Sequence, residues 1–203
     1  LIWASREECG TLEVMRIVVC VKHVPDMQSE RRFEGGRLVR GEDDVLNELD
    51  ENAIEAAVQL KETEEDAGRE AEVVALTMGP EDAEDALMRA LQMGADRAYL
   101  VSDEFLEGSD VITTASVLSV AIAKIADECG PVDLVITGMA SLDAMTSMLP
   151  GALAAKAHMP LLGLARSMSV EDGTVTIERS VDGFTETLRA ALPAVVSVTD
   201  PIN

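Results

Sequence analysis

The stretch DLVITGMASLD, residues 133–143, joins a short apolar run to a loop of small and polar residues. Such a run, ending at a glycine, is typical of a buried β-strand that stops abruptly. Hydroxyl groups at Ser141, Thr146 and Ser147 follow, near the start of a helix expected over about 146–157. Backbone N–H groups at a helix start attract anions, so the stretch suggests a nucleotide phosphate site. An ordinary strand-to-helix connection has similar residues, and both interpretations stay open on this pattern alone.

Strand and helix patterns alternate around this stretch. Apolar runs of strand length are bounded by glycine, proline and polar residues, and the longer segments between them show helical spacing. A hairpin is expected where Asp172-Gly173 joins residues 167–170 to 174–179. Asn47 or Asp50 is the expected N-cap of the first helix, and Asp110 that of the third. The remaining strands are predicted at residues 16–21, 72–77, 97–101, 133–137 and 194–198, and the helices at about 48–62, 80–93, 111–129 and 146–157.

Repeated strand–helix units predict an α/β fold with a mostly parallel, doubly wound sheet and helices on both faces. Ligands of such folds sit beyond the carboxyl ends of the strands, where the strand order reverses. The loops after the first, second and fourth strands are therefore the places where a ligand is expected. A single domain is predicted over residues 15–203, preceded by a disordered extension over residues 1–14.

Composition limits the function classes. The chain has 203 residues, 38 of them acidic and 16 basic, which gives a formal charge of −22. This charge and an aromatic content of 2% argue against nucleic-acid binding, which needs positive charge and stacking surfaces. No apolar stretch is long enough to span a bilayer, so direct membrane insertion is not expected. Three scattered cysteines without zinc spacing (Cys9, Cys20, Cys129) favour a cytoplasmic protein with reduced thiols.

No catalytic motif is recognisable. His23 and His158 are far apart in sequence, and neither belongs to a nucleophile or metal motif. His23 follows the first strand, where it could line the ligand site or be an ordinary loop histidine. Cys20, inside a strand, is expected to be a packed side chain and not a reactive thiol. The sequence therefore favours a binding protein over an enzyme, with no metal site.

Five segments together resemble the beta subunit of electron-transfer flavoproteins, including the FixA-type members. They cover essentially everything from Met15 onward, in order and at compatible spacings. The most specific are LTMGPEDAEDALMRALQMGADRAYLV and the C-terminal stretch around ERSVDGFTETLRAALPAV. The segments are residues 19–26, 47–62, 76–101, 133–143 and 177–203.

The resemblance implies a three-layer α/β/α domain of the adenine nucleotide alpha hydrolase-like, Rossmann-like type, with a C-terminal β-hairpin. It implies a heterodimer with an alpha subunit that holds the redox-active FAD, while the beta subunit holds a structural AMP. Electrons would pass from acyl-CoA dehydrogenases and related flavin dehydrogenases, as in fatty acid β-oxidation, to the electron-transfer flavoprotein quinone oxidoreductase. The chain would be an electron-carrier subunit without catalytic residues.

When the AMP-binding positions of the family are transferred to this sequence, they fall in the three loops that the topology selects. Ser147 and the following helix start would face the phosphate, and Asp143 would fix the loop or bond to the ribose. Met27 and Leu49 fall where the family places side chains near the flavin ring. The cofactor-binding residues would be Cys20, Asn47, Glu48, Leu49, Asp50, Met78, Gly138, Met139, Ala140, Ser141, Leu142, Asp143, Ala144, Met145, Thr146, Ser147, Met148 and Leu149.

The sequence departs from the family pattern in two places. The phosphate loop keeps one acidic residue, Asp143, where relatives often have more, and this leaves open whether AMP or a second FAD is bound, as in electron-bifurcating relatives that use NADH. Phe184 stands where the D-G-G signature of the family usually has its second glycine, so the turn at this position could have a different conformation from that in relatives. The resemblance also places the dehydrogenase-recognition loop and the partner-wrapping arm of relatives after the position of Asn203, so neither is expected within these 203 residues. An ATP-cleaving enzyme of the same fold is a remote alternative, because its S-G-G-x-D-S motif is missing.

Overall fold

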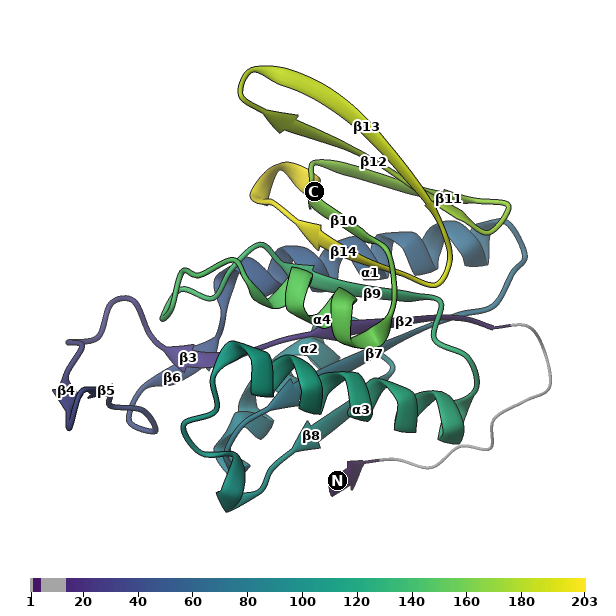
Figure 1. Cartoon of the computed structure of the whole chain (residues 1–203). Coiled ribbons are helices and arrows are strands. Elements are labelled where there is room, and N and C mark those ends of the chain that lie inside the picture. Colours follow the sequence, from purple (N-terminus) through teal and green to yellow (C-terminus); the bar gives the residue numbers. More distant parts are fainter. Residues whose placement is uncertain (1, 5–13) are drawn as a thin grey trace.

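A computed structural model of the chain describes residues 2–4 and 14–203. Its centre is a sheet of six parallel strands, completed at one edge by a short antiparallel strand (Figure 1). The α/β fold with a mostly parallel sheet is thus confirmed. The strands, in spatial order, are β1 (Ile2–Ala4), β8 (Arg97–Val101), β7 (Ala71–Met78), β2 (Met15–Cys20), β9 (Leu134–Gly138), β14 (Ala194–Val198) and β10 (Leu161–Ala165).

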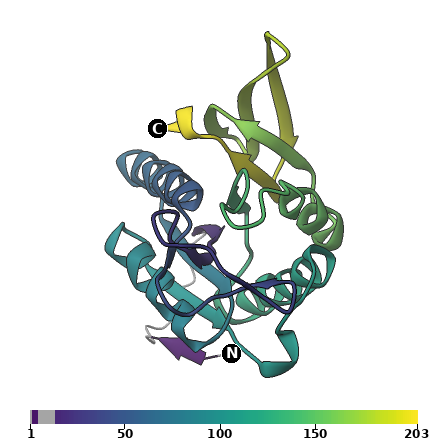
Figure 2. The ribbon, with the colours of Figure 1, turned by 90° about the vertical axis from the view of Figure 1, so that its left-hand side faces the viewer.

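Helices cover both faces of this sheet, as the doubly wound arrangement requires. Buried side chains of α1 (Glu48–Asp66) and α2 (Glu84–Gln92) pack in one hydrophobic core, and those of α3 (Val111–Cys129) and α4 (Leu149–Ala157) in the other. The two layers are seen on either side of the sheet in Figure 2. The predicted N-cap of α3 is confirmed, since the Asp110 side chain accepts a hydrogen bond from the Thr113 backbone.

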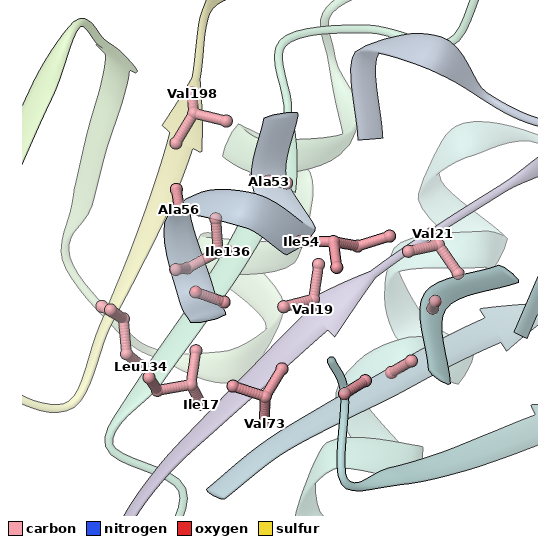
Figure 3. Close-up of a cluster of buried hydrophobic side chains, with 14 of the residues drawn as sticks. Ile17, Val19, Val21, Ala53, Ile54, Ala56, Val73, Leu134, Ile136 and Val198 are labelled. Carbon is pink, nitrogen blue, oxygen red and sulfur yellow. The ribbon is translucent and has the colours of Figure 1, made fainter. Parts of the chain in front are cut away.

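The core is almost entirely aliphatic. Side chains of β2 and β9 alternate between the two faces, and both sets are buried, which explains their continuous apolar runs. On the α1 side, Ile54 packs with Ile17, Val19 and Ile136 in one cluster (Figure 3). Each such side chain contributes about 1.5–3 kcal/mol by leaving water. This packing fixes the positions of the strand ends that form the candidate site.

A separate three-stranded antiparallel sheet is inserted in the sequence between the parallel strands β10 and β14. It is made of β11 (Ser167–Glu171), β12 (Thr174–Val181) and β13 (Phe184–Ala191). The predicted hairpin at Asp172-Gly173 is confirmed. The β12–β13 hairpin projects from the body of the molecule (Figure 1). Its tip is Asp182-Gly183 in left-handed conformation, so Phe184 stands after the turn and is the first residue of β13.

Residues 21–46 form an irregular excursion beyond the carboxyl end of β2 (Figure 1). Strands β3 (His23–Pro25) and β6 (Asp44–Leu46) pair at its base, and β4 (Phe33–Glu34) and β5 (Arg37–Leu38) form a small hairpin at its far end. Gly35-Gly36, both with positive φ, make the hairpin turn. The pair Gly-Gly is a known hairpin signal that the sequence reasoning did not use.

Short 3-10 turns complete the chain at η1 (Glu81–Ala83), η2 (Glu104–Leu106) and η3 (Asp200–Ile202). The last predicted helix was placed to begin near Thr146, whereas α4 begins at Leu149. Met145 and Ser147 adopt left-handed φ values of 50° and 52°, which cannot belong to a right-handed helix. Strands β1, β3 to β6, β10 and β13 were not predicted. The expected extension at residues 1–14 falls mainly on residues 1 and 5–13, which lie outside the described residues.

Candidate functional site

The order of the sheet reverses at β2, because β7 lies on one side of it and β9 on the other. The carboxyl ends of β2 and β9, at Cys20 and Gly138, therefore lie side by side at the position where this fold class binds ligands. Three predicted segments meet there: the end of β2, the start of α1, and the loop 139–148 between β9 and α4. The structure thus brings together the first and fourth of the predicted strand ends, with Met78 at the end of β7 next in the sheet.

Gly138 allows α1 to approach the end of β9 very closely. A Cβ atom at this position would lie 2.5 Å from Asp50 Oδ1 and 2.7 Å from the Leu49 carbonyl oxygen. Real Cβ atoms do not approach other atoms so closely, so only glycine fits here. The group that Gly138 admits so closely is the start of helix α1.

Asp50 ties the two strand ends together. Its Oδ2 atom accepts a hydrogen bond from the Lys22 backbone N–H at 2.9 Å, just after β2, and its carboxylate also accepts from the Gly138 backbone. Burial raises the pKa of Asp50 to about 7, and the hydrogen bonds from Asn47, Lys22 and Gly138 offset that only in part. Asp50 is thus a buried carboxyl group whose role is to hold backbone at the floor of the site.

Asn47 anchors the loop from the same side. Asn47 is the N-cap residue of α1, but its side chain makes no capping hydrogen bond to the helix backbone. Instead Nδ2 donates to the Ala140 carbonyl and Oδ1 accepts from the Leu142 N–H, each at 3.0 Å. Of the two predicted N-cap candidates, Asn47 and Asp50, the structure has Asn47, while the partners of its side chain could not be predicted from helix patterns.

Two cations hold the loop from the excursion. The Asp143 carboxylate accepts from Lys22 Nζ at 2.9 and 3.0 Å and is paired with Arg40. Burial acts to raise the pKa of Asp143, but the hydrogen bond and charge of Lys22, with Ser141 and Arg40, outweigh it and lower the pKa to about 2. Asp143 therefore stays ionised and fixes the loop, which is one of its two predicted roles. Arg31 adds a hydrogen bond to the Leu142 carbonyl at 3.3 Å.

The second half of the loop faces solvent. Met145 and Met148 are exposed, as are Ala144, Thr146 and Ser147. Ser147 lies two residues before the first residue of α4, with its left-handed φ of 52°. Non-glycine residues in this conformation are uncommon and are found at ligand sites more often than elsewhere. The loop is therefore held firmly up to Asp143 and open beyond it.

The other predicted residues differ in their environments. Burial, with the nearby Asp50 carboxylate, raises the pKa of the Cys20 thiol to about 12, so it packs as an uncharged side chain. Glu48 is exposed, whereas Leu49 and Met78 are half-buried at the rim. His23 is buried, and within the described part of the chain neither of its ring nitrogens has a hydrogen-bond partner.

Sequence reasoning missed the three cations that grip the loop, namely Lys22, Arg31 and Arg40. A usable signal was present, because a lysine lies two residues after the end of β2 and four arginines fall within residues 31–40 of a strongly acidic chain. Across the described residues no three His, Cys, Asp or Glu side chains are placed to hold a metal ion. Among those same residues, no helix has both the length and the apolar character that crossing a membrane requires. The arrangement suits recognition of an anionic ligand by backbone donors.

Comparison with known proteins gives a consistent result. Residues 36–203 match the family described as the electron transfer flavoprotein domain. The chain is 42% identical over 190 residues to the electron transfer flavoprotein subunit beta of Mycobacterium leprae (strain TN), covering 92% of this chain and 70% of that protein. It is 34% identical to the protein FixA of Sinorhizobium fredii, over 93% of this chain and 66% of that protein. It is also 34% identical to the caffeyl-CoA reductase-Etf complex subunit CarD of Acetobacterium woodii, over 93% and 70% respectively.

Proposed function

The chain belongs to the electron-transfer flavoprotein family, in its beta-subunit and FixA group, and on that premise we propose that it is the nucleotide-binding subunit of a two-subunit electron carrier. Its own nucleotide is AMP, which has a structural role. The redox-active FAD belongs to an alpha subunit, and the chain itself performs no catalytic step. Acyl-CoA and related flavin dehydrogenases supply the electrons, and a quinone oxidoreductase accepts them from the carrier, which works in the cytoplasm.

The observation that carries the AMP site is the anchoring of loop 139–148 at the point where the strand order reverses. Four side chains from two other segments fix its first half: Asn47 from the start of α1, and Lys22, Arg31 and Arg40 from residues 21–46. Its second half, residues 144–148, is exposed, so a ligand can reach the backbone there. In a chain with a charge of −22, an anion needs local donors, because the overall field repels it.

A second candidate is a bifurcating-type subunit, in which FAD replaces AMP at the same loop. The loop keeps one acidic residue, Asp143, where relatives often have more, and this leaves the choice of nucleotide open. Both candidates use the same residues and differ in the bound molecule.

The test is to express the chain with its alpha subunit, denature the purified heterodimer and quantify the released nucleotides. One FAD and one AMP per heterodimer is the expected result. Two FAD and no AMP would move the protein to the second candidate. FAD without any second nucleotide would refute the proposed site.

A matched pair of variants then tests the loop. Ser147→Asp adds a negative charge where the phosphate is placed, and aspartate tolerates the left-handed backbone there. Ser169→Asp adds the same charge on the exposed face of β11. Loss of AMP in the first variant and full retention in the second is expected, whereas equal retention in both would contradict the assignment of Ser147.

A further inference from the structure

The excursion 21–46 is almost neutral in a chain that is otherwise strongly acidic. It contains five of the 16 basic residues of the chain, against six of its 38 acidic residues. Three of these five cations, Lys22, Arg31 and Arg40, contact loop 139–148. The loop that the proposed function assigns to a nucleotide is therefore lined with positive charge, although the chain as a whole repels anions.

Two carboxylates among the described residues each have two cations within ion-pair distance, namely Glu72 and Asp143. The two arginines that pair with Glu72 have side chains that are 4% and 19% exposed. The Asp143 side chain is 2% exposed, whereas Lys22 is 41% exposed and Arg40 37%. The cluster at Glu72 is thus closed to solvent, whereas the cluster at Asp143 presents its two cations to solvent.

The cations at the loop have hydrogen-bond donors that the protein does not use. An arginine side chain has five N–H groups. Within the described part of the chain, Arg31 donates one hydrogen bond, to the Leu142 carbonyl at 3.3 Å. Arg40 contacts the His23 carbonyl and the Asp143 carboxylate there. Both arginines are therefore positioned by the protein and keep donors for a ligand.

The three side chains converge on one short stretch of the loop. Lys22 Nζ and Arg40 Nη2 contact the same oxygen atom, Asp143 Oδ2, and Arg31 binds the carbonyl of the preceding residue. Residues 144–148, where the nucleotide phosphate is placed, follow directly in the chain. A phosphate group has several acceptor oxygens and can accept hydrogen bonds from lysine and arginine at the same time.

Negative charge around the three cations does not balance them. Asp143 is the carboxylate that they contact, and Asp50 is buried below, where it accepts from the Lys22 backbone. Three positive charges therefore face two carboxylates, of which one is buried. The carboxylates of the excursion itself form no ion pair with Lys22, Arg31 or Arg40. These are Asp26, Glu30, Glu34, Glu42, Asp43 and Asp44.

We propose that Lys22, Arg31 and Arg40 form an oxyanion subsite that binds a phosphate group in addition to the one placed at Ser147. The inference rests on the proposed function, which supplies the nucleotide. The second phosphate group belongs to a nucleoside diphosphate or is a free phosphate ion beside AMP, and the chemistry of recognition is the same. Arginine binds phosphate through charge-assisted, frequently bidentate hydrogen bonds, and lysine adds a point charge.

The experiment refolds the denatured heterodimer with an equal mixture of AMP and ADP and measures the ratio of ADP to AMP that the protein retains. We expect the wild type to prefer ADP by roughly tenfold or more, the effect of one hydrogen bond between charged groups. Arg31→Gln and Arg40→Gln should each bring the ratio close to one, and Arg31→Lys, which keeps the charge, should restore part of the preference. A variant that only loosens the loop loses both nucleotides alike and leaves the ratio unchanged.

Arg37→Gln is the matched control. Arg37 belongs to the same excursion but pairs with Glu107, on the loop after β8. Its removal changes the charge of the excursion by the same amount and should leave the ratio as in the wild type. Raising salt from about 50 to about 500 mM should lower the wild-type ratio, because part of the attraction is electrostatic.

A second refolding, with AMP and inorganic phosphate in place of ADP, distinguishes the two sources of the anion. Retention of AMP that rises with phosphate concentration shows that the subsite takes a free ion. A preference for ADP without this effect shows that it takes the second phosphate of the nucleotide.

Equal retention of AMP and ADP by the wild type, with no effect of phosphate, would overturn the subsite and leave the AMP site intact. A preference for ADP that persists in Arg31→Gln and Arg40→Gln would also overturn it, because other groups would then bind the second phosphate. Retention of no adenine nucleotide by the wild type in either mixture would refute the proposed function together with the subsite.

Discussion

The side chain of Asn47 holds the backbone of Leu142, with Oδ1 accepting the Leu142 N–H at 3.0 Å and Nδ2 donating to the neighbouring Ala140 carbonyl. Asn47 is fully buried, and both bonds cross from the start of α1 to the loop after β9. An amide side chain can make both bonds from a single position, because its nitrogen donates and its oxygen accepts. The loop thus depends on the identity of one residue almost a hundred positions away.

Replacing Asn47 with alanine should remove both bonds and leave a buried N–H and a buried carbonyl without partners. We expect a loss of about 2–4 kcal/mol in the free energy of unfolding, measured by urea denaturation, together with loss of the bound nucleotide. Asn52→Ala is the control, because its side chain makes only an exposed bond to Asp200. A loss below 1 kcal/mol at Asn47 would show that the loop does not need this anchor.

Gly138→Ala should be severely destabilising. The new methyl group would collide with the Asp50 carboxylate and the Leu49 carbonyl, and backbone cannot move aside cheaply. We expect a cost of about 3 kcal/mol or more in thermal or urea unfolding. Gly151 lies inside α4, and a Cβ atom there would be 3.9 Å from the nearest atom outside its own helix, Leu161 Cδ2, which is an ordinary contact. Gly151→Ala should therefore raise the free energy of unfolding by up to about 1 kcal/mol. Equal effects at the two sites would contradict the close approach.

Thr77→Val should stabilise the protein. The Thr77 hydroxyl is buried, and among the described residues it has no hydrogen-bond partner, so removing it relieves a desolvation cost of about 1 kcal/mol. Thr137→Val is the matched change at the end of β9, where the hydroxyl does donate to the Gly138 carbonyl at 2.9 Å. The free energy of unfolding of Thr137→Val should fall by about 1 kcal/mol. Unfolding midpoints that move in the same direction would refute this difference.

Asp50 should make stability depend on pH. Its pKa in the folded protein is about 7, above the ordinary value of 3.8, so the folded state binds the proton more tightly than the unfolded state. The contribution of Asp50 is most favourable below pH 4 and is lost as pH rises to 7, by on the order of 4 kcal/mol. Relative to Asp50→Asn, the wild type should thus lose stability between pH 4 and 7. A constant difference between the two proteins over that range would exclude the raised pKa.

Much of the fold was predictable because the parallel strands are buried on both faces. β8 and β14 were predicted with the correct ends, and β2, β7 and β9 within one residue at each end. β10 was not predicted, because Gly163 and Leu164, which has a left-handed backbone, interrupt the apolar pattern of its five residues. β13 has few apolar positions, and pairing with β12 along its whole length is what makes it a strand.

The candidate site was predictable as a place but not as a set of contacts. Strand order alone selects the loops after β2 and β9. The pairing of Lys22 and Arg40 with Asp143, however, joins residues that are 121 and 103 positions apart, and local patterns carry no information about it. Asp50 was expected to cap a helix or contact a nucleotide, whereas it holds the backbone of two strands. Its role follows from the close approach at Gly138, which only the tertiary structure shows.

The clasp that Asp50 forms between β2, β9 and α1 has a kinetic consequence. The ends of β2 and β9 and the start of α1 are joined by a single buried carboxyl group. None of these three elements can therefore move away from the others unless the protein unfolds there. On the proposed function, a nucleotide bound against the first half of loop 139–148 would be released only when the Asn47 and Asp143 contacts break. We then expect exchange to be slow compared with the hours of a purification, so that the nucleotide released from the isolated protein is the one bound during folding in the cell.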